Sequence, residues 1–145
     1  HQELEYCGHL TVAENMLLGE RWPRRWGGRI DWAAMRFEAG QRLQRAGCEV
    51  AADAQFSRLT AVEKQLVAIA TALARDARLL ILDEPTASLA APDARRLIDH
   101  LKTIRDSGVA IIYVSHRLDE VLELSDRIAV LRDGELVHLA GADAP

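Results

Sequence analysis

The chain has 145 residues, a formal net charge of −4 and two cysteines, and this length lies in the range of a single domain. The acidic balance argues against a dedicated nucleic-acid-binding protein, and Cys7 and Cys48 lack the close spacing of a zinc site or a disulfide framework. No apolar run approaches the ~20 residues of a membrane span and we see no signal peptide, so we expect any membrane association to come through a partner.

The first part of the chain, residues 1–76, carries helical signals. A Thr-x-x-Glu capping box stands ahead of apolar residues over 11–18, and a second one opens a pattern of apolar residues at helical spacing over 60–73. Between them, an aspartate that can cap a helix and a glycine that can end one enclose a third helical pattern over 31–47. We therefore expect this part to be a helical subdomain.

The remainder, residues 77–145, alternates strands with helices, which indicates an α/β fold. Residues 79–82 are a short, wholly apolar run, and we expect a strand that is buried on both faces, as in parallel sheets. Asp133 and Gly134 stand between two apolar runs and are a hairpin signal. After the first strand we expect a helix over 92–107, a strand over 109–114, a short helix over 117–124 and paired strands over 127–131 and 135–139.

Two adjacent carboxylates, Asp83 and Glu84, end the first of these strands. Pro85 follows them and cannot continue the hydrogen-bond ladder, so both acids belong at the carboxyl edge of the sheet, where open α/β sheets bind ligands. Asp83 is suited to holding Mg²⁺ on a nucleotide, and Glu84 to orienting or deprotonating an attacking water. For an isolated Asp-Glu pair the alternative is a strand that simply ends in a polar turn.

His116 follows the second apolar strand of this part of the chain. If the two strands are neighbours, the imidazole lies near Asp83 and Glu84. A histidine in that place can donate a hydrogen bond to a γ-phosphate, whereas an isolated histidine after a strand is more often structural. The residues alone leave both interpretations open, and the family resemblance described next favours the functional one.

Four segments resemble, in order, the motifs of ATP-binding cassette (ABC) ATPases. HQEL at 1–4 is similar to the Q-loop, LTAVEKQLVAIATALARDA at 59–77 to the signature motif and its helix, LLILDEPTASL at 79–89 to the Walker B segment and D-loop, and IIYVSHRLDEV at 111–121 to the switch strand and H-loop. The sequences HQEL…LTVAEN and SHRLDEV…LRDG most resemble the first cassette of bacterial monosaccharide importers, those for ribose, galactose or xylose.

The resemblance implies a partial P-loop NTPase (RecA-like) core over 77–145, preceded by an N-terminal helical ABC subdomain over 1–76 that meets the permease. It implies ATP and Mg²⁺ as cofactors. Glu84 and His116 would be catalytic, while Asp83 and Gln2 would hold Mg²⁺ with the nucleotide, and Gln2 would also couple ATP binding to the permease. The D-loop would comprise Ser88, Leu89 and Ala90, and the signature that contacts nucleotide bound to a second cassette would comprise Leu59, Thr60, Ala61, Val62 and Glu63.

The signature and the D-loop both depart from the family's pattern. The familiar signature is LSGGQ, whereas this chain replaces both glycines, by Ala61 and Val62, and brings a negative charge with Glu63. Two interpretations stay open: contact with phosphate, or a capping box that only begins the helix. If Val62 obstructs the phosphate, Val62→Gly is expected to raise ATPase activity. In the D-loop, Ala90 stands where many cassettes carry aspartate.

The phosphate-binding Walker A loop, GxxxxGK[ST], is missing from this sequence. The two lysines, Lys64 and Lys102, follow Glu63 and Leu101, so no Gly-Lys pair exists in the chain. In the family, Walker A precedes the Q-loop, and this chain opens on the Q-loop-like segment. We therefore expect the later part of a cassette, inactive when tested alone.

The loop RWPRRWGGR over 21–29 interleaves arginine with tryptophan. Such a loop can bind nucleic acid, a membrane surface or a partner helix. We expect instead a solvated loop with tryptophans packed on a neighbour. Contact with the permease is the main alternative, because the resemblance assigns this region to the helical subdomain.

Taken together, the resemblance implies an ATP-binding and ATP-hydrolysing subunit of an ABC importer for a monosaccharide, peripheral to the cytoplasmic face of the bacterial inner membrane. Its partners would be a second ATP-binding cassette, transmembrane permease subunits and, indirectly, a periplasmic sugar-binding protein, with no nucleic acid. The alternatives are a soluble ABC-type ATPase that acts outside transport and a non-catalytic cassette remnant.

Overall fold

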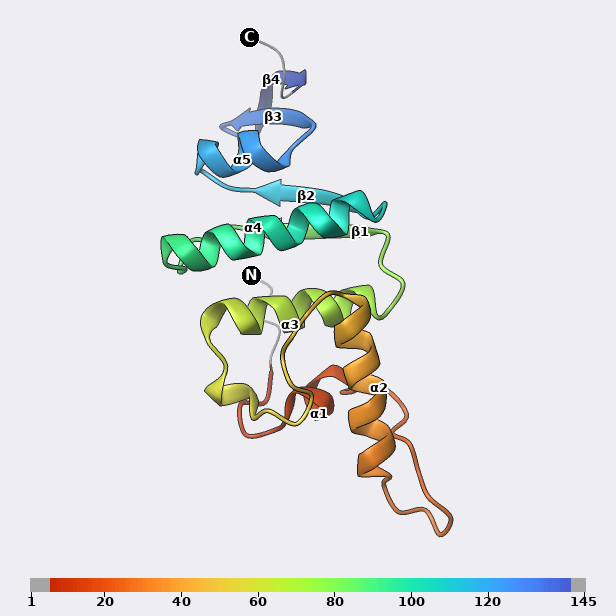
Figure 1. The fold of residues 1–145 in the computed structure, drawn as a ribbon. Helices are drawn as coiled ribbons and strands as arrows, with labels where there is room; N and C mark the ends of the chain where they lie inside the picture. Colours follow the sequence, from red (N-terminus) through yellow and green to blue (C-terminus); the bar gives the residue numbers. More distant parts are fainter. Residues whose placement is uncertain (1–5, 142–145) are drawn as a thin grey trace. The chain divides into compact units, whose positions relative to one another are not determined.

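A computed structural model describes residues 6–141 of the chain (Figure 1). The chain divides into two compact units, His1–Arg78 and Leu79–Pro145. The first unit is helical in its described residues, and the second mixes helices with strands. Within the described residues, no helix is long and apolar enough to span a membrane.

The helices of the first unit begin where the sequence predicts. They are α1 (Val12–Met16), α2 (Trp32–Arg45), a 3₁₀ turn (Phe56–Arg58) and α3 (Ala61–Leu73). Thr11 caps α1 and Thr60 caps α3, each in a complete capping box. The Asp31 side chain accepts two backbone N–H groups at the start of α2, and Gly47, at φ 67°, ends that helix in the left-handed conformation that glycine adopts at low cost. The three α-helices are therefore confirmed, whereas the 3₁₀ turn is not among the predicted elements.

Two polar side chains hold the segments between these helices. Asn15, only 3% exposed, accepts the Cys7 N–H at 2.8 Å and donates to the Cys7 and Thr11 carbonyls. Arg42 of α2 donates to both carboxylate oxygens of Glu20, at 2.9 and 2.7 Å. These hydrogen bonds lower the pKa of the Glu20 carboxyl. The segment after α1 is therefore fixed on α2 by a two-pronged, charge-assisted contact.

The second unit contains a parallel strand pair and an antiparallel hairpin. Strand β1 (Leu79–Asp83) pairs in parallel with β2 (Ala110–Val114), and the register places Leu82 opposite Tyr113 and Asp83 opposite Val114. The crossover between them contains α4 (Ala91–Asp106), whose buried face is formed by Ala94, Leu97, Ile98, Leu101 and Ile104. Helix α5 (Leu118–Leu124) follows β2. The parallel pairing predicted for β1 is thus found.

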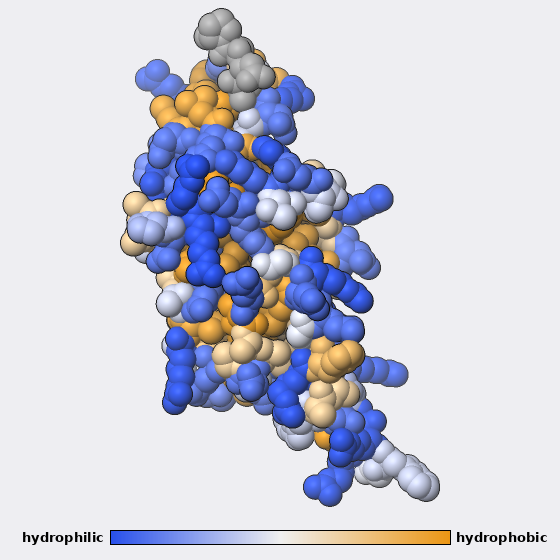
Figure 2. Space-filling view, in the orientation of Figure 1, coloured by the Kyte–Doolittle hydropathy of each residue, from blue (hydrophilic) through white to orange (hydrophobic). Residues whose placement is uncertain are grey.

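Strands β3 (Arg127–Arg132) and β4 (Glu135–Gly141) form the predicted hairpin, with a register shift between Val130 and Leu131. Asp133 and Gly134 both have positive φ, 52° and 82°, as a two-residue turn of the primed type requires. Several apolar side chains of the hairpin are exposed, among them Leu131, Leu136 and Val137. The orange patch near the top of the space-filling view lies where Figure 1 places β3 and β4 (Figure 2).

The prediction that β1 is buried on both faces is wrong. Leu80 and Leu82 are buried, but Leu79 and Ile81 are 48% and 64% exposed. In β2, Ile112 and Val114 are likewise about half exposed. The apolar run correctly predicts a strand. Successive side chains of a strand point to opposite faces, and the described residues cover only the face that carries Leu80 and Leu82. The other face is an apolar surface.

Candidate functional site

The acidic pair lies at the carboxyl end of β1. Asp83 is the last residue of the strand and its side chain is exposed. Glu84 donates its backbone N–H to the Val114 carbonyl of β2 at 2.9 Å, and its φ of 47° is in the left-handed region. A non-glycine residue in that region is strained, and such strain is concentrated at functional sites. Because of this turn, the Glu84 side chain points in a different direction from the one it would have if β1 continued through residue 84.

The side chains of Glu84 and His116 meet. His116 Nδ1 lies 2.8 Å from Glu84 Oε1, and the imidazole is 75% exposed whereas the carboxylate is 36% exposed. The second oxygen, Oε2, is buried and has no hydrogen-bond partner among the described residues. A buried carboxylate oxygen in this condition is a place for an ordered water or ion. The predicted closeness of His116 to the acidic pair is therefore confirmed, and what these groups do is taken up below.

A buried network lies directly behind this pair. Glu120, on α5 and 5% exposed, accepts hydrogen bonds at Oε2 from Thr86 Oγ1 at 2.6 Å and from the Tyr113 hydroxyl at 2.5 Å. Its Oε1 lies 2.8 Å from Arg117 Nη1, an ion pair without hydrogen-bond geometry. Burial, and after it the bond to Glu120, raises the pKa of Tyr113. The phenol therefore remains a proton donor to the carboxylate at neutral pH.

Sequence reasoning missed this network. A signal existed in α5, because Glu120 belongs to the face that also carries Val121 and Leu124, and all three are buried. A carboxylate on the apolar face of a helix must find partners. Thr86 and Tyr113 gave no comparable signal, since a threonine in a turn and a tyrosine in a strand are ordinary.

The signature-like segment begins α3 in the first unit. Thr60 Oγ1 accepts the Glu63 N–H, while Glu63 Oε2 accepts both the N–H and the hydroxyl of Thr60, at 2.8 Å each. The helix-capping interpretation is therefore borne out, although it does not exclude contact with a phosphate. Leu59 is half-buried and Ala61 is exposed.

Val62 does not obstruct the surface of this segment. Its side chain is 2% exposed and belongs to the core of the first unit. This corrects the expectation that Val62→Gly opens the approach to a phosphate.

We therefore expect Val62→Gly to lower the free energy of unfolding by about 2–3 kcal/mol, from lost burial and the lower helix propensity of glycine. Urea denaturation of the chain measures the change. Ala61→Gly, at the exposed neighbouring position, is the matched control and should cost no more than about 1 kcal/mol. Equal costs for the two variants would contradict the core position of Val62.

The remaining predicted site residues are those of the D-loop-like segment and Gln2. Ser88 and Ala90 are exposed in the turn before α4, and the Leu89 N–H bonds the Thr86 carbonyl. Ala90 is the N-cap of α4 and supplies no side-chain cap. Gln2 lies outside the described residues. The structure thus brings Glu84 and His116 into contact, and Asp83 precedes Glu84 at the end of β1. Nowhere in the described part of the chain do three His, Cys, Asp or Glu side chains gather as a metal site.

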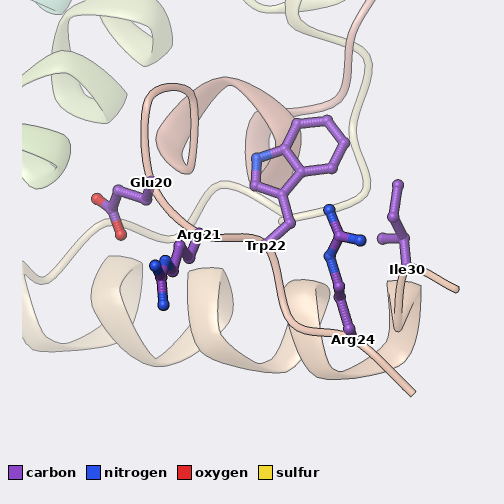
Figure 3. A pocket seen from close by; sticks show the side chains of 5 residues that line it. All are labelled: Glu20, Arg21, Trp22, Arg24 and Ile30. Carbon is purple, nitrogen blue, oxygen red and sulfur yellow. The ribbon is translucent and has the colours of Figure 1, made fainter. Parts of the chain in front are cut away.

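The arginine-tryptophan loop is an ordered hairpin. Arg24 and Ile30 form an antiparallel bridge, and Trp22 packs edge-on against Trp32 and donates its indole N–H to the Leu17 carbonyl. A surface pocket at its base is lined by Glu20, Arg21, Trp22, Arg24 and Ile30 (Figure 3). Trp26, in contrast, is fully exposed. The expectation that the tryptophans pack on a neighbour is therefore right for Trp22 and wrong for Trp26.

The fold is that of an ATP-binding cassette. The chain superposes with a TM-score of 0.70 on a dimeric, post-hydrolysis form of the cassette MJ0796 bound to ADP and Pi, at 25% identity, covering 99% of this chain and 62% of that one. A nucleotide-free cassette from an ABC transporter gives a TM-score of 0.74 over 92% of this chain and 56% of that chain. The predicted α/β, P-loop NTPase class is confirmed. Residues 1–87 match the sequence model of the family described as ABC transporter, and this chain belongs to that family.

The curated relatives most similar in sequence that we compared include ATP-binding proteins named for sugar import. The chain is 49% identical over 144 residues to the ribose import ATP-binding protein RbsA 2 of Rubrobacter xylanophilus, which covers 99% of this chain and 28% of the relative. It is 46% identical to a putative ribose/galactose/methyl galactoside import ATP-binding protein of Burkholderia ambifaria, over 99% of this chain and 27% of the relative. The chain therefore spans a little over a quarter of the length of these relatives.

Proposed function

We propose that this chain is part of the ATP-hydrolysing subunit of a bacterial ABC importer, with a monosaccharide as the transported substrate. The observation that carries the proposal is the contact between Glu84 and His116 at the end of a parallel strand, in a chain 49% identical to a ribose import ATP-binding protein. A carboxylate with one oxygen held by a histidine and the other buried without a partner suits the activation of a water.

The described residues fit a magnesium nucleotide at this edge. Carboxylate oxygens are the ligands that Mg²⁺ prefers. Asp83 offers an exposed carboxylate at the end of β1, and the next residue, Glu84, has a buried Oε2 without a hydrogen-bond partner among the described residues. Bound Mg²⁺ would offset the negative charge of the triphosphate. Asp83 would hold the metal together with Gln2, which is not among the described residues. Glu84 would accept the proton of the water that attacks the γ-phosphorus. His116, as an imidazolium with both ring N–H groups, would donate from Nδ1 to Glu84 and from Nε2 to a γ-phosphate oxygen.

The partners follow from the same proposal. A second ATP-binding cassette would complete each site through its signature segment, corresponding here to Leu59, Thr60, Ala61, Val62 and Glu63, while Ser88, Leu89 and Ala90 would lie at the D-loop. Transmembrane permease subunits would anchor the protein to the cytoplasmic face of the inner membrane, and a periplasmic sugar-binding protein would deliver the substrate. Trp26 and the neighbouring arginines would contact the permease, because a fully exposed indole on an ordered hairpin is an interaction anchor.

The test is ATP-driven uptake of radiolabelled ribose, galactose and xylose by proteoliposomes that contain the full-length protein and its permease. We expect uptake of at least one sugar, and loss of uptake in His116→Ala. His138→Ala, in the exposed β4 strand, should leave uptake unchanged. ATP hydrolysis without uptake of any sugar would favour an ABC-type ATPase outside sugar transport, and absence of hydrolysis would favour a non-catalytic cassette.

A further inference from the structure

The two loops that carry Glu84 and His116 are tied together by one carboxylate oxygen. Thr86 lies two residues after Glu84, and Tyr113 lies three residues before His116. Both hydroxyls donate to Oε2 of Glu120, at 2.6 and 2.5 Å, and they lie 3.4 Å from each other. Glu120 itself sits on α5, the helix that begins two residues after His116.

We propose that Glu120 is a positioning residue, which fixes the distance between Glu84 and His116 by joining Thr86 to Tyr113. This inference rests on the proposed ATP hydrolysis, and it adds a role for a residue that acts through Glu84 and His116.

Burial makes this junction stiff. Thr86 is 0% and Glu120 is 5% exposed, so water does not compete for the hydrogen bond between them, and Tyr113 is half-buried. Hydrogen bonds to a charged acceptor are stronger than those between neutral groups. Arg117 at Oε1 balances the buried charge. The junction is therefore strong enough to hold both loops against the local backbone strain.

Glu84 needs such a constraint. Its φ of 47° is unfavourable for a residue with a side chain, and the turn that follows is closed by the Ala87 N–H on the Glu84 carbonyl and by the Leu89 N–H on the Thr86 carbonyl. Within this turn, the Glu84 N–H is bonded to the Val114 carbonyl of β2, and Thr86 is the residue whose side chain is bonded to α5. If that bond is lost, the turn can relax and Glu84 Oε1 can leave His116 Nδ1.

The first measurement does not depend on hydrolysis. In full-length protein with ¹³C-labelled histidine, the His116 resonance, assigned by its loss in His116→Ala, should move in Thr86→Val toward its position in Glu84→Gln. Thr86→Ser, which keeps the hydroxyl, should restore the wild-type position. Thr103→Val is the matched control, because the Thr103 hydroxyl bonds a carbonyl of its own helix, α4. An unmoved His116 resonance in both Thr86→Val and Glu120→Gln would overturn the inference.

The second measurement is a kinetic cycle. Thr86→Val and Glu120→Gln should each lower kcat for ATP by about 10–100-fold, the worth of one such hydrogen bond, with KM unchanged. In the Glu84→Gln background they should cost nothing further, since they act through Glu84. Additive losses would mean a general structural effect and overturn the inference. Glu123→Gln, on the same helix and paired with Lys102 and Arg95, should leave kcat unchanged. A moved His116 resonance in a protein without ATPase activity would contradict the proposed function and leave the positioning role standing.

Discussion

Glu84→Gln in the full-length protein is expected to leave ATP binding intact and to lower turnover by about 10²–10⁴-fold, the usual contribution of a general base. This loss corresponds to about 2.7–5.4 kcal/mol of transition-state free energy. The amide keeps the shape of the side chain and still reaches His116, but it cannot accept a proton from water. Steady-state phosphate release, together with binding of a fluorescent ATP analogue, separates the two effects.

The matched control is Glu135→Gln, an exposed carboxylate at the start of β4 in the same unit. It removes the same charge far along the chain from the site and should retain full turnover. The turnover of His116→Ala should lie between those of Glu84→Gln and Glu135→Gln. This variant should impair ATP hydrolysis more than ATP binding. Unchanged turnover in Glu84→Gln would remove this residue from the mechanism.

The second large effect concerns the 145-residue chain itself. We expect it to bind Mg-ATP far more weakly than micromolar and to show no hydrolysis. Most phosphate affinity in such proteins comes from a glycine-lysine loop with its ring of backbone N–H donors, and neither lysine of this chain follows a glycine. Asp83 and Glu84 alone would face a highly negative triphosphate.

Isothermal titration calorimetry with Mg-ATP measures this binding. The full-length protein under the same buffer conditions is the positive comparison. Circular dichroism should accompany the titration, because the half-exposed apolar face of β1 and β2 lowers the stability expected of the chain. A micromolar dissociation constant for the folded 145-residue chain would indicate a phosphate site elsewhere in it.

Local signals predicted most of the fold. The capping boxes at Thr11 and Thr60 and the aspartate cap at Asp31 fix where three helices begin, because each satisfies backbone N–H groups through residues close in sequence. The Asp133-Gly134 turn likewise defines its hairpin through the backbone preferences of two residues. Such interactions can be read from a sequence since both partners stand within a few positions.

Features that depend on distant partners could not be predicted in this way. The burial of β1 depends on what covers each face, and an apolar run looks the same whether one face or both are covered. The core position of Val62 follows from how α3 turns toward its neighbours. In the site, the order of the motifs predicted Glu84 and His116. The apolar face of α5 indicates that Glu120 needs partners, but Thr86 lies 34 positions away, and the sequence alone does not identify it as one of them.

The positive φ of Glu84 also bears on protein engineering. A left-handed residue with a side chain costs about 1–2 kcal/mol, and glycine avoids this cost. A screen that rewards thermal resistance alone would thus favour glycine at position 84 and discard the carboxylate at the same time. Stabilised versions of this protein should be sought with position 84 held fixed, because the substitution that raises thermal stability there removes the carboxylate proposed for catalysis.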